Sequence, residues 1–382
     1  MGCCGSTADE TTCGCSRTPE KAGPTVLVDG FDPAKKIPPW VAGTVSTAAG
    51  IAPRIFTKLL AADVMGAWKA RWGIGRMNYT IAPGLYAVGT PDVDSPVLVS
   101  ANYKMSFDRL HRELTGIDAW ILVLDTKGIN VWCSAGKGTF GTDELVRRVN
   151  GFGLEDVVAH RRLILPQLGA PGVAAHEVQR RTGFKVIYGP VRAGDLPAFL
   201  IAGNEAMPEM RQVAFSFMDR LVLTPIELVG VIKPALVLIG LLFVLMLIRK
   251  PSAPFLLLVD HTIVAFVPFL GAILAGAVVA PTLLPFIPGR AFAWKGWLVG
   301  LVWSIIFVFS ISADWTLALF YLLVLPAVSG YLTMNFTGAS TYTSLSGVVK
   351  EMKTALGALV VSAGLGFVLL LGRVAGQALG IL

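Results

Sequence analysis

The residue most able to do chemistry is Cys133, in the stretch Asn-Val-Trp-Cys-Ser-Ala-Gly-Lys-Gly over residues 130–138. The other four cysteines, Cys3, Cys4, Cys13 and Cys15, all lie near the N-terminus, so Cys133 is alone in the body of the chain. An unpaired cysteine in a cytoplasmic domain is a candidate for chemistry rather than for a disulfide. Asn130 is a preferred N-cap residue, which places Cys133 in the first turn of a short helix. Backbone N–H groups favour an anionic thiolate there.

Two better-known motifs resemble this stretch, and both fit poorly. The glycines at 136, 138 and 141 have the spacing of a dinucleotide fingerprint, but about ten residues separate them from the preceding strand, where that fingerprint needs none. The Gly136-Lys137 pair resembles a phosphate loop, but Val131 replaces its first glycine and no Ser or Thr follows the lysine. Two readings of Cys133 remain on residue grounds alone. It is either a buried structural cysteine, or a ligand on a helix whose small residues leave room for a large flat group.

The elements that must position Cys133 are an alternation of apolar strands and helices. The run 120–124 is continuously apolar, as in a parallel strand covered on both faces, and it directly precedes the cysteine stretch. This alternation predicts a parallel, Rossmann-like α/β domain with its ligands at the carboxyl ends of the strands. We expect strands at 97–100, 120–124, 162–165 and 185–188, and helices at 44–72, 106–114, 142–149 and 173–181.

Charge divides the chain into two parts of different character. Only 15% of all 382 residues are charged, against about 25% in a soluble globular chain. The charged residues concentrate between Lys21 and Arg220, and long apolar runs follow. We expect a disordered cysteine-containing tail at 1–24, an α/β domain at 25–215 and an all-α transmembrane domain at 216–382. Its five helices should lie near 227–248, 261–280, 292–312, 315–335 and 354–372.

The first ten residues carry no basic and apolar segments of a secretory signal, which favours a cytoplasmic N-terminal domain. The positive-inside rule agrees by a narrow margin. Cytoplasmic loops would carry Arg290, Lys295, Lys350 and Lys353, against Arg249, Lys250 and Arg373 outside. A multi-pass protein of the cell inner membrane, in contact with membrane lipid, is therefore expected. No basic stripe interleaved with aromatic residues occurs, so nucleic acid is not an expected partner.

The cysteine stretch resembles the cap-helix motif of the mercury-methylating corrinoid proteins, which are related to the corrinoid iron–sulfur protein subunit of the acetyl-CoA pathway. Two further stretches are similar to that family. Residues 100–108, Ser-Ala-Asn-Tyr-Lys-Met-Ser-Phe-Asp, look like its first strand and loop. Residues 335–338 and 343–347 look like its loop between the last two membrane helices. The resemblance covers about residues 80–382.

This resemblance implies a corrinoid (cobalamin-type) cofactor and a role for each residue of the motif. Cys133 would be the lower axial ligand to cobalt, in place of the usual histidine or benzimidazole, and no Asp-x-His-x-x-Gly motif surrounds any of the four histidines. Asn130 and Trp132 would orient the cap helix beneath the corrin, with Lys137 and Asn130 tuning the thiolate. The implied cofactor-binding residues are Asn130, Val131, Trp132, Cys133, Ser134, Ala135, Gly136 and Lys137, together with Ser100, Asn102, Ser106 and Ala193.

The implied reaction is a methyl transfer from a folate-type donor through cobalt to Hg(II), giving methylmercury, in the one-carbon metabolism of an anaerobe. A thiolate ligand donates electron density to the metal, which suits an electrophilic acceptor. The implied partner is a ferredoxin-like protein with two 4Fe–4S clusters. Two alternatives stay open: a corrinoid methyl carrier for another metal, metalloid or one-carbon partner, and a non-catalytic membrane sensor.

One position departs from the family pattern, and one region lies outside the resemblance. The family usually has Ala after the motif cysteine, and here Ser134 brings a hydroxyl beside the sulfur, where a hydrogen bond would weaken its donation. The tail cysteines Cys3, Cys4, Cys13 and Cys15 could deliver Hg(II), since paired thiols bind soft metals. The tail is otherwise a myristoylation acceptor, from Gly2 and Ser6, or a dispensable extension.

Overall fold

The computed structural model describes residues 25–32, 37–339 and 345–378. The chain divides into two compact units, each with its own core. The first contains residues up to Asp63 together with Tyr79–Arg211, and is an α/β unit. The second contains Val64–Asn78 together with the residues from Gln212 onward, and is helical. Residues 64–78 therefore belong to the helical unit although they precede most of the sheet in the chain.

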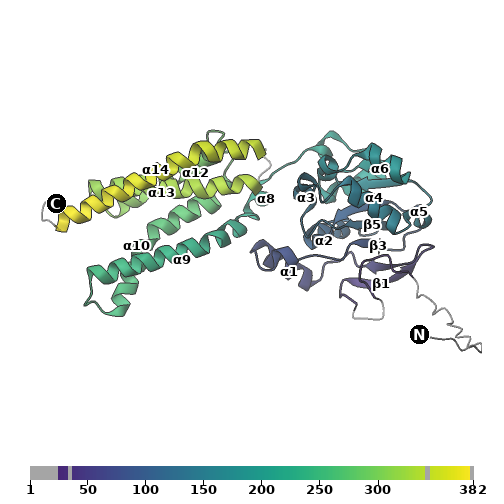
Figure 1. The fold of residues 1–382 in the computed structure, drawn as a ribbon, viewed down its shortest axis with the longest axis horizontal. Coiled ribbons are helices and arrows are strands. Elements are labelled where there is room, and N and C mark those ends of the chain that lie inside the picture. The colour runs from purple at the N-terminus through teal and green to yellow at the C-terminus, as the bar shows by residue number, and fades with distance from the viewer. Residues whose placement is uncertain (1–24, 33–36, 340–344, 379–382) are drawn as a thin grey trace, which may run out of the picture. The chain divides into compact units, whose positions relative to one another are not determined.

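The α/β unit is built on one seven-stranded sheet of mixed direction (Figure 1). Strands β4, β5, β6 and β7 are all parallel, as the apolar runs in the sequence predict. The order is β1-β2-β3-β5-β4-β6-β7, with β3 antiparallel to β5 and β1 antiparallel to β2. The strands are β1 Val41–Ser46, β2 Ile51–Ile55, β3 Gly84–Val88, β4 Val97–Ala101, β5 Ala119–Leu124, β6 Arg162–Leu165 and β7 Lys185–Tyr188.

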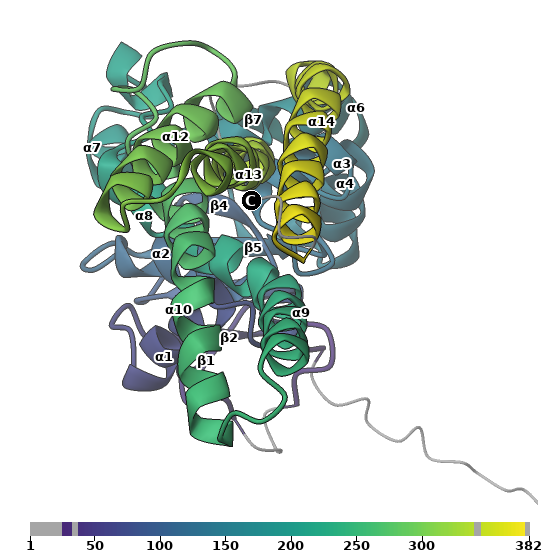
Figure 2. The same cartoon turned by 90° about the vertical axis from the view of Figure 1, so that its left-hand side faces the viewer.

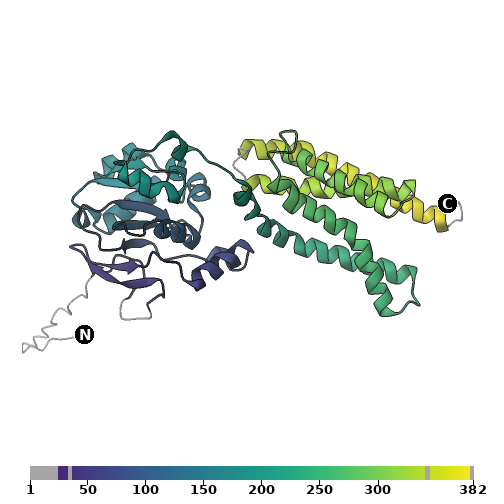
Figure 3. The same cartoon turned by 180° about the vertical axis from the view of Figure 1, so that it is seen from behind.

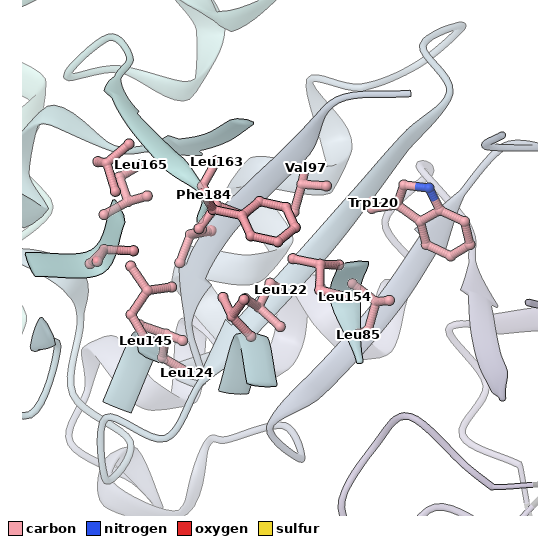
Figure 4. Packing of buried hydrophobic residues seen from close by; sticks show 14 of the residues in the cluster. Leu85, Val97, Trp120, Leu122, Leu124, Leu145, Leu154, Leu163, Leu165 and Phe184 are labelled. Carbon is pink, nitrogen blue, oxygen red and sulfur yellow. The ribbon is translucent and has the colours of Figure 1, made fainter. Parts of the chain in front are cut away.

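Helices cover both faces of this sheet, and adjacent strands lead to opposite faces. Residues of α2 and α7 pack on one face, and residues of α4, α5 and α6 pack on the other. Figure 4 shows the second of these layers, where Leu145 and Leu154 meet Leu122 and Leu124 of the central strand. The helices are α2 Lys104–Arg112, α3 Val131–Lys137, α4 Thr142–Gly151, α5 Leu154–Val157, α6 Ala175–Thr182 and α7 Leu196–Ile201.

The expected helix over residues 44–72 is wrong for its first part. Residues 41–55 form the hairpin β1–β2 instead, and only α1, Ala61–Arg71, is helical. The β-branched residues of this stretch favour strands, and Gly50, with a φ of 149°, lies in the turn between them. A methyl group at Gly50 would come within 2.1 Å of the Thr25 carbonyl oxygen, so the turn also needs glycine to pack.

The helical unit contains five helices long and apolar enough to cross a membrane, among the residues that the structure describes. They are α9 Thr224–Arg249, α10 Phe255–Leu274 with its continuation to Thr282, α12 Phe292–Ser310, α13 Trp315–Asn335 and α14 Leu345–Ala378. A shorter helix, α8 Phe217–Leu221, leads into α9. Helix α13 packs between α12 and α14, and α9 packs against α10 (Figure 2).

Small residues let these helices approach closely, as is usual where packing rather than hydrophobicity drives association. A methyl group at Gly276 would come within 2.4 Å of the Ser329 carbonyl oxygen, and one at Gly300 within 2.5 Å of Ser329 Cβ. Thr333 Oγ1 donates to the Gly276 carbonyl at 2.8 Å, within a π-helical turn, η5 Ala275–Val279. Figure 3 shows these helices from behind. These close contacts show that the helices of the unit pack against one another as a bundle.

Candidate functional site

The loop between β5 and α3 is held by one buried amide, that of Asn102 at the end of β4. Asn102 Oδ1 accepts hydrogen bonds from the backbone N–H groups of Thr126 at 3.1 Å and Gly128 at 3.0 Å. Its Nδ2 donates to Asp125 Oδ1 at 3.3 Å. Thr126 Oγ1 lies 2.8 Å from Asn102 Oδ1. The resemblance predicts Asn102 as a pocket residue, and in the structure it fixes the loop that leads to Cys133.

Asp125 strengthens the same loop through its charge. Its carboxylate accepts from the backbone N–H of Lys127 at 3.1 Å and pairs with the Lys127 ammonium. Burial alone would raise the pKa of Asp125, but the hydrogen bonds from Lys127 hold it below its ordinary value. Its own N–H donates to Glu144 at 2.9 Å, which ties the end of β5 to α4. The start of the loop is therefore fixed from both sides.

Helix α3 begins as the sequence predicts. Asn130 is its N-cap, and the Asn130 side chain accepts from the backbone N–H of Cys133 at 2.9 Å. Gly138 ends the helix with a φ of 80°, a left-handed conformation that suits glycine. The cap fixes the first turn of the helix, and with it the direction of the cysteine backbone.

The two faces of α3 differ completely in exposure. Trp132, Cys133, Gly136 and Lys137 are exposed, whereas Ser134 and Ala135 are buried. A methyl group added at Gly136 or at Gly138 would meet no atom within 4 Å. Cys133 is therefore not the buried structural cysteine that residue type alone allowed. Cys133 and Trp132 are both exposed on this face of α3, where Gly136 and Gly138 carry no side chain.

The buried face of α3 packs directly on the turn η2, Gln167–Gly172, which follows β6. A methyl group at Gly172 would lie 2.1 Å from the Phe140 carbonyl oxygen and 3.0 Å from Ala135 Cα. One at Gly169 would lie 2.6 Å from the Phe140 ring, which is fully buried. These contacts require glycine at both positions. One face of α3 is therefore fixed by its contacts with η2, and the opposite face is open to solvent.

The hydroxyl of Ser134 does not point at the sulfur. Ser134 is fully buried, and its Oγ lies 2.6 Å from the Asn130 carbonyl and 3.0 Å from the Val131 carbonyl. A hydroxyl has one hydrogen to donate, and these backbone oxygens take it. The expected weakening of the thiolate by Ser134 is therefore wrong. The residue instead stabilises the first turn of α3.

The other residues implied by the resemblance share one edge of the sheet with α3. Ser100 lies at the end of β4 and is buried. Ser106 is in the first turn of α2 and Ala193 is in the turn η3, Ala193–Asp195, after β7; both are partly exposed. Because β4, β5 and β7 belong to one parallel set, the residues that follow them lie at the same carboxyl edge. The helices after β4 and β5 cover opposite faces, which marks the position where open α/β sheets bind ligands.

Sequence reasoning missed four residues of this site, which are Asp125, Thr126, Phe140 and Gly172. Thr126 and Gly172 act through contacts with residues far away in the chain, Asn102 and Phe140, so no local pattern marks them. Residues 169–172, Gly-Ala-Pro-Gly after a predicted strand, are the one local signal that a tight turn lies there.

A second polar group lies at the start of α2, after β4. Lys104 Nζ pairs with Asp63 at 2.7 Å and with Asp108 at 2.6 Å, and all three side chains are buried. The hydroxyl of Tyr79 donates to Asp108, and Trp40 lies 5.5 Å from the ammonium. Burial, and next the charge of Asp108, raise the pKa of Tyr79 well above its ordinary value, which keeps it a neutral donor. This cluster was not foreseen from the sequence.

Comparison with known proteins shows that the part of the chain containing this edge of the sheet is similar to a known family. Residues 75–200 match the family described as CO dehydrogenase/acetyl-CoA synthase delta subunit. The chain is also 35% identical over 122 residues to an acetyl-CoA decarbonylase/synthase complex subunit gamma of Methanopyrus kandleri, covering 31% of this chain and 26% of that protein. The corresponding subunit of Archaeoglobus fulgidus is 33% identical over 127 residues, covering 33% and 27%.

This part of the α/β unit is related to the acetyl-CoA decarbonylase/synthase subunits. The matched residues 75–200 run from just before β3 into α7, and so include all the loops described above. The chain spans about a quarter of the length of these curated relatives. The matched region leaves β1, β2 and the five apolar helices outside it.

No group of three or more His, Cys, Asp or Glu in the described part of the chain is placed to hold a metal ion. A metal bound to Cys133 would therefore need its other ligands from outside these residues. Cys3, Cys4, Cys13 and Cys15 lie outside the described residues, as do residues 340–344 of the loop that resembles the corrinoid family.

Proposed function

We propose that this chain is a membrane-bound, corrinoid-dependent methyltransferase that passes a methyl group to Hg(II), giving methylmercury. The observation that carries the proposal is the open face of α3. Cys133 lies exposed on a capped, clamped helix beside two glycines with empty space above them. It lies within the region related to the acetyl-CoA decarbonylase/synthase subunits, and its sequence resembles the cap helix of the mercury-methylating family.

The residues present fit a corrinoid. Cys133 would offer its sulfur to the cobalt, and the bare surface at Gly136 and Gly138 would leave room for a large flat group. A cobalt corrinoid supplies a carrier from which a methyl group can pass to a soft, electrophilic metal ion. Three contacts fix α3 and the loop before it: the Asn130 cap, the Asn102–Asp125 hydrogen bonds and the packing at Gly172. Because α3 is already ordered, binding of the cofactor would not have to order it.

The polar groups around α3 have separate tasks. The Ser134 hydroxyl donates to backbone carbonyls, which leaves the sulfur free to donate its electron density to a metal. Lys137, exposed one turn after Cys133, would place a positive charge near the sulfur and near any anionic group of a bound ligand. Trp132, which is exposed on the same helix, would offer an apolar ring to the bound group. Of the other residues that the resemblance implies, Ser106 and Ala193 are partly exposed at the same edge of the sheet and would contact the bound group, whereas the buried Ser100 and Asn102 would support it from behind.

The proposed setting is the inner membrane, with the α/β unit in the cytoplasm and the five apolar helices as its anchor. Methyl groups would be loaded from a folate-type donor, and a ferredoxin-like protein with two iron–sulfur clusters would return the cobalt to its reduced state. The curated relatives are named as subunits of a complex, which supports a partner of this kind. The tail cysteines would deliver Hg(II).

A second candidate is a corrinoid methyl carrier that serves a one-carbon partner rather than mercury. The observation in its favour is that the curated relatives are named for acetyl-CoA decarbonylase/synthase. The five apolar helices lie outside the matched region, which favours a function different from that of those subunits.

The test measures methylmercury formation from isotopically labelled Hg(II) in anaerobic cells that express this chain with a ferredoxin partner. Wild type and Cys133→Ala are compared, and the corrinoid content of each purified protein is measured. Product from the wild type alone supports the proposal. A wild type that binds corrinoid but forms no methylmercury contradicts the mercury assignment and favours the second candidate. A wild type without corrinoid contradicts both candidates.

A further inference from the structure

A short segment before β3 carries an apolar surface that neither the methyl-transfer site nor the helix bundle uses. Residues 64–78 comprise most of α1, a turn and the 3-10 helix η1, Arg76–Asn78, and they group with the helical unit. Six large apolar side chains in these fifteen positions are between 37% and 65% exposed. They are Val64, Met65, Trp68, Trp72, Ile74 and Met77.

The exposed side chains of α1 form one stripe. At about 100° per residue, Val64, Met65, Trp68 and Trp72 fall within an arc of about 100°. Ala70, on the opposite side of the helix, is buried. The helix is therefore covered on one side and presents a continuous apolar surface on the other. In water such a surface is unfavourable, and a stripe with two tryptophans is typical of a helix lying at a membrane surface.

The position of the segment indicates what covers the stripe. Gly73 lies against the beginning of α9, since a methyl group there would come within 3.1 Å of Ile226 Cδ1 and 3.6 Å of Val229 Cγ1. Ile226 and Val229 belong to the first turns of α9, the first of the five helices long enough to cross a membrane. Residues 64–78 thus lie at the level where this helix would enter the bilayer.

The charges of the segment are complementary to an anionic lipid surface. Residues 64–78 contain Lys69, Arg71 and Arg76 and no acidic residue. On the helical arc, Lys69 and Arg71 fall on the two sides of the apolar stripe. Long basic side chains in this position extend along the apolar surface and place their charges among lipid headgroups. Tryptophan is enriched at the same depth of a bilayer.

We propose that residues 64–78 form an interfacial membrane-binding segment. The stripe of Val64, Met65, Trp68 and Trp72 lies among the acyl chains of the leaflet that α9 enters, with Lys69 and Arg76 at anionic headgroups. This proposal does not depend on the function proposed for α3, and it holds whether the methyl acceptor is mercury or another group.

The test uses the full chain in lipid nanodiscs, with the five cysteines replaced (Cys133→Ala, the others by Ser) and one nitroxide-labelled cysteine introduced. Met65→Cys and Ile74→Cys probe the segment, and Glu155→Cys, exposed on α5, is the matched control. Collision of the label with oxygen, which concentrates in lipid, and with a water-soluble nickel complex is measured by electron paramagnetic resonance. The ratio of oxygen to nickel accessibility should be several-fold higher at 65 and 74 than at 155.

Two outcomes would overturn the proposal. Equal ratios at all three sites would show that the segment is in water. Low accessibility to both reagents at 65 and 74 would show that protein, not lipid, covers the stripe. The headgroup contact is tested by adding phosphatidylglycerol to phosphatidylcholine nanodiscs. This should raise the ratio at position 65, and the double variant Lys69→Gln/Arg76→Gln should remove the increase. An unchanged response in the double variant would contradict the role of the basic residues.

Discussion

Two neighbouring parallel strands, β4 and β5, end in polar regions of opposite character. After β4, Lys104 and Asp108 of α2 are buried, and the Lys104 ammonium forms ion pairs with Asp108 and with the buried Asp63 of α1. After β5, the loop and α3 place a single thiol at the surface, with the supporting polar groups below it. The region richer in titratable groups is the structural one. The proposed corrinoid site is therefore marked by exposure and empty space rather than by a cluster of charges.

The largest expected effect comes from breaking the buried cluster. Lys104→Met removes the ammonium that pairs with both buried carboxylates, Asp63 and Asp108, and removing one partner of a buried ion pair costs about 3–5 kcal/mol. Lys137→Met, on the exposed face of α3, should change the free energy of unfolding by less than about 0.5 kcal/mol. Thermal unfolding of the detergent-solubilised full chain compares the two. Equal losses in both variants would mean that the cluster after β4 contributes no more than the exposed surface.

The next effect separates the two faces of α3. Gly172→Ala places a methyl group 2.1 Å from the Phe140 carbonyl, so α3 must move, at a cost of about 1–3 kcal/mol typical of overpacking. Gly136→Ala meets no atom and should stabilise the helix by up to about 1 kcal/mol. Both should lower corrinoid affinity, the first by moving the cysteine and the second by filling the space above it. Corrinoid binding and thermal unfolding, measured on the same samples, test this opposition.

If Gly136→Ala binds corrinoid as well as the wild type does, the open face of α3 is not the cofactor surface. If Gly172→Ala unfolds at the wild-type temperature, the contact with η2 does not hold the helix. The first result would contradict the role proposed for the open face of α3, and the second would contradict the role of its packed face.

A smaller effect distinguishes the cap from the thiol. Asn130→Ala removes the bond to the backbone N–H of Cys133 and should cost about 1 kcal/mol, whereas Asn130→Ser keeps a capping oxygen and should cost less. Cys133→Ala changes an exposed side chain and should leave stability within about 0.5 kcal/mol of the wild type. Thermal unfolding ranks the three variants. A large loss of stability in Cys133→Ala would contradict the exposed position of the thiol.

The sequence predicts the central part of this arrangement because its signals are local. Strands β6 and β7 have the predicted bounds, since each is an apolar run closed by proline or glycine. The Asn130 cap is likewise readable from residue type. The hairpin β1–β2 was mistaken for a helix, because its apolar residues also fit helical spacing. The Asn102 hub and the Gly172 contact could not be predicted, because each joins residues that only the folded sheet brings together.

The last and smallest effect concerns the charge of Asp125, which stabilises the loop after β5. The pKa of Asp125 is lower in the folded chain than its ordinary value of about 3.9. Ionised Asp125 therefore stabilises the loop fully at pH values above that ordinary pKa. This contribution should disappear as the pH falls through the lower, folded value. Hydrogen exchange of peptides covering residues 125–138, corrected for the intrinsic rate, should therefore show less protection at acid pH in the wild type. Asp125→Asn keeps the shape of the side chain without its charge, and its protection should be lower at neutral pH and change less on acidification. The same acid dependence in both proteins would assign it to another group, and the loop after β5 would then owe its order to Asn102 alone.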